Sequence, residues 1–292
     1  MIWLAAALAL AAAVYGLCWW GAGIILHPPG MSPMEIFPEQ FGLRYEKIAF
    51  KTRDGLELKG WFIPSMTGDT RTVLMCHGWG DNKGELLQQT YFLNASGGFN
   101  LMYFDFRSHG ESEGEITTIG GLETIDFDAA VDWLETNRPE QARSVGVFGL
   151  SMGAAVTVAA MPKHPDLRCA VVESPFSDYR TVIKRWAWNH FKVPYYPLVA
   201  LTLLILRSRV KDPEIDSFNP VEAAPHISPR PLFVIGGVND RLMTPEDVKK
   251  VFAATREPKQ LWMVPGAQHA GCREAAGLEY ETRVIGFFSR NL

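Results

Sequence analysis

Residues 146–154 read GVFGLSMGA, and one serine, Ser151, stands there between two glycines. An apolar run precedes it at 144–149, and a run with helical character follows it at 152–161. A serine on a sharp strand-to-helix turn projects its hydroxyl from the edge of a sheet. The flanking glycines are needed where side chains would clash with the neighbouring strand and helix. The stretch predicts either a tight corner or a catalytic nucleophile, and the rest of the chain decides between them.

Short apolar runs alternate with helical stretches along most of the chain. The expected strands are 43–51, 56–63, 72–76, 100–106, 144–149, 169–173, 231–236 and 260–264, with helices near 83–96, 122–137 and 152–161 and after each of the last two strands. This alternation predicts an α/β fold with a mostly parallel central sheet flanked by helices. The Asp54-Gly55 pair between the first two strands predicts an antiparallel hairpin at one edge.

Composition narrows the classes of function. The chain has 292 residues, 47% of them hydrophobic, and a net charge of −4 without a basic run, which argues against a nucleic-acid partner. The four cysteines, Cys18, Cys76, Cys169 and Cys272, have neither the spacing of a disulfide framework nor that of a zinc site. We expect them to be small buried hydrophobic side chains.

Residues 2–26 form an uncharged apolar stretch that is long enough to cross a bilayer. Its 25 residues span about 37 Å as a helix, and Trp19 and Trp20 stand near its end, where interfacial aromatic residues occur. A cleaved signal peptide needs a basic region before its apolar core, and the chain has no Lys or Arg before Arg44. We predict an uncleaved single-pass anchor. The positive-inside rule weakly favours a catalytic domain on the cytoplasmic side of the membrane. The side on which this domain lies stays undetermined.

The predicted organisation is an anchor at 1–26, a linker at 27–42 and one α/β domain at 43–292. The alternation is interrupted at about 176–218, which contains an uncharged run of 13 residues at 194–206. The flanking basic residues are Arg185, Lys192, Arg207, Arg209 and Lys211. Two interpretations stay open for this insertion: a helical cap packed on the sheet, or a mobile hydrophobic lid that contacts substrate or lipid.

A nucleophilic serine needs a base, and the base needs a carboxylate to orient it. His269 lies in the loop after the strand 260–264, and Asp240 lies just past the strand 231–236. The carboxyl ends of parallel strands meet at one edge of the sheet, so we expect Ser151, Asp240 and His269 to meet there. Less favoured alternatives are His109 as the base and Glu173 or Asp178 as the acid.

Acyl transfer also needs donors for the oxyanion. We predict that they are the backbone N–H groups of Met152, directly after the nucleophile, and of Trp79 in the loop His77-Gly78-Trp79-Gly80. His77 is another conceivable base, but at this position we expect it to brace the loop.

From about residue 43 to the C-terminus the chain resembles the alpha/beta-hydrolase superfamily. It is most similar to the branch of N-terminally anchored serine hydrolases that is labelled serine-aminopeptidase-like. The motifs that carry the resemblance are HGWG (77–80), the run Asp105, Arg107, His109, Gly110 and Ser112, GLSMG (149–153), GGVND (236–240) and the late His269. The resemblance implies an alpha/beta-hydrolase fold with a helical cap, and structural roles for Asp105, Arg107 and His109. Gly236-Gly237 departs from the commoner His-Gly pair before the acidic loop residue.

Three functions remain. The first is a membrane-anchored serine hydrolase that cleaves small-molecule or lipid-like esters or thioesters with an apolar acyl group and needs no metal or organic cofactor. The second is a serine peptidase of the aminopeptidase type, which needs carboxylates for a free amino group, and residues 176–211 offer only Asp178. The third is a non-catalytic protein of the same fold that binds a partner. The sequence leaves the oligomeric state undetermined.

Overall fold

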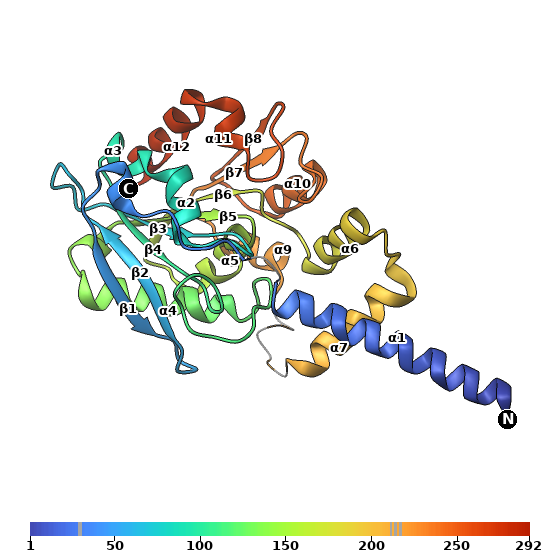
Figure 1. Cartoon of the computed structure of the whole chain (residues 1–292). Helices are drawn as coiled ribbons and strands as arrows, with labels where there is room; N and C mark the ends of the chain where they lie inside the picture. Colours follow the sequence, from blue (N-terminus) through green and yellow to red (C-terminus); the bar gives the residue numbers. More distant parts are fainter. Residues whose placement is uncertain (29–30, 211, 213–214, 216–217) are drawn as a thin grey trace.

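The central sheet has eight strands in the order β1-β2-β4-β3-β5-β6-β7-β8 (Figure 1). This computed structural model describes residues 1–28, 31–210, 212, 215 and 218–292. The strands are β1 (Glu46–Lys51), β2 (Glu57–Ile63), β3 (Thr72–Cys76), β4 (Asn100–Phe104), β5 (Val145–Leu150), β6 (Leu167–Glu173), β7 (Leu232–Gly237) and β8 (Lys259–Val264). β2 pairs antiparallel with both β1 and β4, and all other pairs are parallel. The predicted mostly parallel sheet and its edge hairpin are confirmed.

Helices cover both faces of the sheet, as the buried strands require. The helices are α1 (Ile2–Leu26), α2 (Lys83–Thr90), α3 (Phe92–Ala95), α4 (Glu123–Asn137), α5 (Met152–Ala160), α6 (Tyr179–Phe191), α7 (Ala200–Arg209), α9 (Pro220–Ala223), α10 (Pro245–Ala254), α11 (Cys272–Ala276) and α12 (Leu278–Asn291). One core contains residues of α4, α5 and α10, and the other contains residues of α2, α3, α11 and α12. All four cysteines are buried and free, in agreement with their expected role as small core side chains.

The predicted helix near 83–96 is divided into two. Asn82 caps α2 by accepting hydrogen bonds from the backbone N–H groups of Gly84 and Glu85. Tyr91 separates α2 from the short helix α3. Tyr91 itself keeps helical backbone angles, φ −54° and ψ −26°, and Phe92 and Leu93 after it are buried in the core.

The N-terminal helix α1 projects away from the rest of the molecule, with the N-terminus at its far end (Figure 1). By length and composition it can cross a membrane, a property that an anchor and a signal sequence share. Only one side of its last turns is buried, at Cys18, Ala22, Ile25 and Leu26. The carbonyl of Leu26 accepts a hydrogen bond from the N–H of Thr117 at 2.9 Å, so the helix end is fixed to the α/β body.

The insertion contains α6, a π-helical turn at Tyr195–Val199 and α7. We call these three elements together the cap. α7 lies along α1 (Figure 1), and the thiol of Cys18 contacts the carbonyl of Leu198 at 3.5 Å. Lys211, which we expect to flank the cap, and Pro29-Gly30 of the expected linker lie outside the described residues. The boundaries of anchor, linker and domain stay predictions.

Candidate active site

Ser151 occupies the sharp turn between β5 and α5, with φ 54° and ψ −112°. Positive φ is uncommon for a residue with a side chain, and the packing around the turn enforces it. A Cβ on Gly153 would lie 2.1 Å from the carbonyl oxygen of Cys76, and one on Gly149 would lie 2.5 Å from that of Gly153. The glycines of the opening motif are therefore required by close approach of backbone to backbone.

A Gly153→Ala substitution is expected to lower the free energy of unfolding by about 3 kcal/mol, because the neighbouring backbone oxygens must shift. Chemical denaturation of the two proteins measures the difference. Gly271→Ala is the matched control, since its Cβ would make ordinary contacts of 3.5 Å or more. Equal stability of the Gly153 variant and the wild type would contradict this explanation of the motif.

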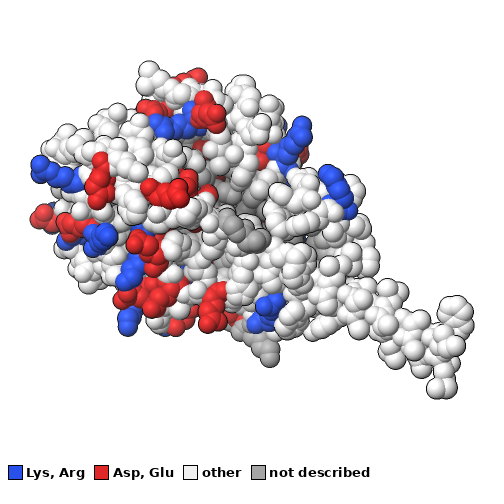
Figure 2. All heavy atoms as spheres, viewed as in Figure 1, with Lys and Arg blue, Asp and Glu red and all other residues white. Residues whose placement is uncertain are grey.

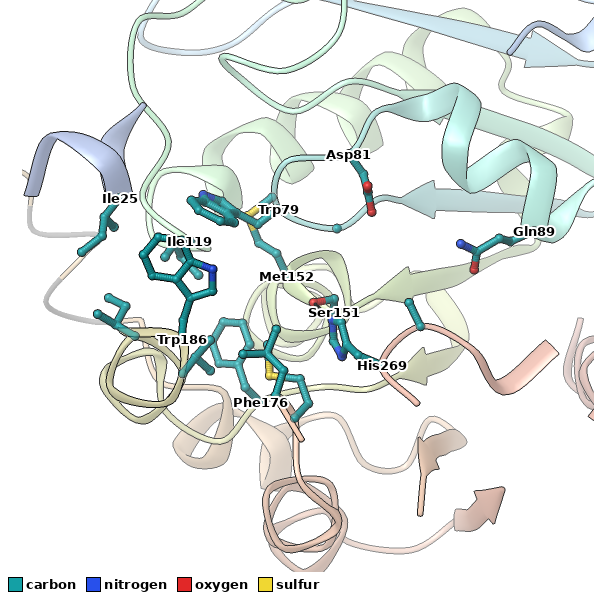
Figure 3. Close-up of a pocket in the computed structure, with 16 residues that line it drawn as sticks. Ile25, Trp79, Asp81, Gln89, Ile119, Ser151, Met152, Phe176, Trp186 and His269 are labelled. Carbon is teal, nitrogen blue, oxygen red and sulfur yellow. Dashed lines mark hydrogen bonds between the residues drawn. The ribbon is translucent and has the colours of Figure 1, made fainter. Parts of the chain in front are cut away.

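The three predicted residues meet at the carboxyl edge of the sheet. The Oγ of Ser151 lies 3.0 Å from Nε2 of His269 (Figure 3), and Nδ1 of His269 lies 2.8 Å from Oδ2 of Asp240. Asp240 is buried, and its Oδ1 accepts hydrogen bonds from the N–H groups of Leu242 and Met243 at 2.8 Å each. The carboxylate is thus fixed, and it favours the tautomer that leaves Nε2 free to accept the serine proton.

Met152, one predicted oxyanion donor, directly follows the serine, and the loop that carries the other, Trp79, lies against it. Met152 is the first residue of α5, so its N–H has no acceptor within the helix. A Cβ on Gly78 would lie 3.6 Å from the Cβ of Ser151, which places the loop of Trp79 against the nucleophile. The N–H of Gly153 donates to the carbonyl of His77 at 3.1 Å and joins this loop to the turn.

The alternative bases have both ring nitrogens engaged elsewhere. Nδ1 of His77 donates to the carbonyl of Gly78, and its Nε2 accepts from the N–H of Phe106. His109 is held in the same way, between the carbonyl of Arg107 and the N–H of Gly80. Burial lowers the pKa of both imidazoles, which keeps them neutral. Both histidines therefore brace the loops around the site.

The alternative acids do not contact His269. Glu173 accepts hydrogen bonds from the hydroxyl of Tyr280 and the N–H of Cys272, and burial raises its pKa. Asp178 is exposed and caps the N-terminus of α6 by accepting from the N–H of Arg180. Asp240 is the acid that the geometry pairs with the histidine.

A buried ion pair supports the loop that carries Trp79. Nζ of Lys83 lies 2.5 Å from Asp105 and 2.6 Å from Glu111, and both Lys83 and Asp105 are completely buried. Asp105 also accepts from the backbone N–H groups of Lys83 and Glu111. Arg107 forms a second buried pair with Asp126 at 2.7 Å. These contacts support the structural roles implied for Asp105 and Arg107.

A pocket of about 440 Å³ opens in front of Ser151. Most of its wall is apolar and comes from the cap, the α/β body and the last turn of α1; Figure 3 shows Ile25, Trp79 and Trp186 together on one side of Ser151. The polar residues that line it besides Ser151 and His269 are Asp81 and Gln89. Such a wall fits an apolar substrate group with a few polar contacts near the reacting atoms.

Asp81 and Ile25 are residues of the pocket that the sequence analysis missed. Asp81 follows HGWG directly, so its place in the loop of Trp79 was the available signal. Burial raises the pKa of its carboxyl to about 6, with a smaller contribution from the nearby charge of Glu85. Among the described residues its carboxylate has no hydrogen-bond partner, which leaves it available to a substrate.

Comparisons with known proteins bear on the fold and on the class of enzyme. The family model of the X-Pro dipeptidyl-peptidases (S15 family) matches residues 61–190. The solved structure of the esterase Pf2001 from Pyrococcus furiosus is 27% identical, with a TM-score of 0.75 over 91% of this chain and 98% of that one. The acylaminoacyl peptidase of Pyrococcus horikoshii is 16% identical, with a TM-score of 0.64 over 86% of this chain and 42% of that one. The uncharacterized protein YfhR of Escherichia coli K12 is 25% identical over 83% of this chain and 80% of its own length.

Proposed function

We propose that this chain, which is an alpha/beta hydrolase with esterase and peptidase relatives, is a serine hydrolase held at a membrane by α1. Its proposed reaction is the hydrolysis of carboxylic esters or thioesters that carry an apolar acyl group. The observation that carries the proposal is the row of hydrogen bonds from Ser151 through His269 to Asp240 at the floor of an apolar pocket.

The first half of the proposed reaction forms an acyl-enzyme. The Oγ of Ser151 attacks the carbonyl carbon of the substrate while Nε2 of His269 takes the serine proton. Asp240 stabilises the imidazolium that results. The carbonyl oxygen becomes an oxyanion and accepts hydrogen bonds from the N–H groups of Met152 and Trp79. The bond to the leaving oxygen or sulfur then breaks, and the imidazolium supplies the proton of the leaving group.

The second half of the proposed reaction releases the acid. Water attacks the acyl carbon while His269 takes a proton from it, and the bond to the Oγ of Ser151 then breaks as His269 gives that proton to Oγ. The products are a carboxylic acid and the regenerated serine. Every proton in this sequence passes through His269, so the reaction needs no metal and no organic cofactor.

A peptidase that acts at a free amino terminus is the second candidate. It is supported by the S15 family match and by Asp81, whose carboxylate faces the pocket and is suited to bind an ammonium group. The predominantly apolar wall and the nearness of α1 favour the ester, because an ammonium group usually needs more than one polar partner.

A substrate panel tests the choice between ester hydrolysis and peptide hydrolysis. The full chain is offered p-nitrophenyl esters from acetyl to palmitoyl and aminoacyl p-nitroanilides, and labelling of Ser151 by a fluorophosphonate is measured in parallel. We expect labelling and ester turnover, with anilides at least about tenfold slower. Preference for the anilides would favour the peptidase. Absence of labelling and of both turnovers would overturn the proposal and favour a non-catalytic binding protein.

Asp81→Asn is expected to stabilise the protein at pH 8 and to have almost no effect at pH 4. The pKa of Asp81 is raised to about 6, so the folded state loses stability as the pH rises from about 4 to 6, where the unfolded chain ionises first. Asparagine has no proton to lose. Thermal unfolding at both pH values measures the effect, with the exposed Glu274→Gln as control. An equal change in the unfolding temperature at both pH values would contradict the burial of this carboxyl.

A further inference from the structure

A second cavity, of about 230 Å³, adjoins the pocket of Ser151. It lies between α1 and the cap, and it shares Ile25, Ile183 and Trp186 with that pocket. Trp186 also packs edge-on against Trp79 at 6.1 Å between ring centroids. The three shared side chains therefore form a seam that separates the second cavity from the reacting atoms, and we call it the Ile25 seam.

The apolar walls of the second cavity favour a hydrocarbon chain over a polar group. α1 contributes Leu17, Cys18, Trp20, Gly21 and Ile24, and the cap contributes apolar residues together with Thr202. The hydroxyl of Thr202 donates to the carbonyl of Leu198 and offers no free proton. An ester or headgroup would lose its hydrogen bonds to water in this cavity, whereas an acyl chain loses none.

The level of the cavity along α1 matches the surface of a bilayer. About 20 helical residues cross the hydrocarbon core, so a span that begins at Ile2 ends near Gly21. Trp19 and Trp20 lie there, and Arg209 donates to the carbonyl of Trp19 with its guanidinium 4.7 Å from the indole ring. Aromatic and arginine side chains are typical of the membrane interface. The cavity thus lies at the level of the boundary between the acyl chains and the headgroups.

The outer surface of the cap is suited to the same environment. Outside residues 1–26, five of the eight large apolar side chains that the described residues expose belong to the cap: Trp188, Phe191, Tyr196, Leu201 and Leu204. In Figure 2 the white surface of α1 continues onto the neighbouring part of the molecule with isolated blue side chains. A patch of this kind next to a membrane span marks a surface that contacts lipid.

We propose that α1 is a wall of the substrate site and that the substrate is a membrane lipid ester with a long acyl chain. The chain leaves the bilayer between α1 and the cap, fills the second cavity and passes the Ile25 seam, so that its carbonyl carbon lies at Ser151. This inference rests on the proposed function, and it explains why the end of α1 is buried against the catalytic pocket.

Gly21→Leu tests the path, because Gly21 lines the second cavity and its Cβ would already contact Thr202 at 3.4 Å. Gly16→Leu is the matched control: it places the same side chain on the same helix where a Cβ meets nothing within 4 Å. The full-length proteins are compared in phosphatidylcholine vesicles with p-nitrophenyl butyrate and palmitate. Thr202→Leu fills the cavity from the cap and serves as a second variant.

Gly21→Leu is expected to lower the ratio of kcat/KM for palmitate to that for butyrate by about tenfold or more, since each excluded methylene costs several-fold in binding. Gly16→Leu should leave the ratio unchanged. An unchanged ratio in both cavity variants would overturn the path and leave the hydrolase proposal intact. Failure of a short-chain fluorophosphonate to label Ser151 in the wild type would instead overturn both. Should Gly21→Leu lose all activity, the ratio in Thr202→Leu decides.

Discussion

Replacing Ser151 with alanine is expected to lower kcat for ester hydrolysis by about 10⁶-fold, which is the scale of a lost nucleophile in serine hydrolases. His269→Ala should cost about the same, and the double variant little more, because the two residues act as one unit. Steady-state kinetics with p-nitrophenyl butyrate measure all three. The residual rate comes from the oxyanion donors and from binding.

The acid of the site is tested in the same assay. Asp240→Asn is expected to lower kcat by about 10⁴-fold, since an amide favours the wrong histidine tautomer. Glu173→Gln should retain most of the activity, because its carboxyl contacts Tyr280 and Cys272 instead of His269. The reverse result would assign the acid to Glu173. Ser174→Ala is the control for the nucleophile, since it removes a buried hydroxyl without a partner among the described residues.

Lys83→Met is expected to lower the free energy of unfolding by about 3–5 kcal/mol, which is the scale of a broken buried ion pair. Methionine has a similar length, so the loss comes from Asp105, whose carboxylate is left buried without its cation. Chemical denaturation gives the difference. Because Asp105 holds the start of α2 through the N–H of Lys83, ester turnover should fall as the loop of Trp79 loosens.

A double variant separates charge from packing. Lys83→Met combined with Asp105→Asn removes both charges, and it should recover a large part of the lost stability. The exposed pair Arg283–Glu279 provides the control, since Arg283→Met should change the stability by less than about 1 kcal/mol. A double variant as unstable as Lys83→Met would show that packing dominates.

The sequence predicted which strands and turns carry the residues of the site, because strands and turns depend on local signals. β3, β5, β7 and β8 are short apolar runs, and the turn after each begins with residues of distinct chemistry. Parallel strands bring those turns to one edge whatever the details of packing. Hence the order of Ser151, Asp240 and His269 and their positions after expected strands predicted that they meet, and the structure brings them within hydrogen-bond distance.

The features that the sequence did not predict depend on contacts between distant parts of the chain. The Ile25 seam joins the end of α1 to α6, more than 150 residues away, and no periodicity in the apolar stretch 2–26 marks the side that docks. Asp81 lies in a predicted loop, but its burial follows from the packing around that loop. The division of the helix at Tyr91 has no local signal either, because 85–96 contains no Gly or Pro.

The hydrogen bond between the carbonyl of Leu26 and the N–H of Thr117, together with the buried Ala22 and Ile25, joins the end of α1 to the α/β body. For a chain inserted in a bilayer by α1, the mouth of the pocket then has a set height and a set angle to the membrane plane. For the lipid ester proposed above, encounter with the enzyme would then be a search in two dimensions. The rate would follow the surface density of the ester among its neighbouring lipids, and bulk concentration would describe it poorly.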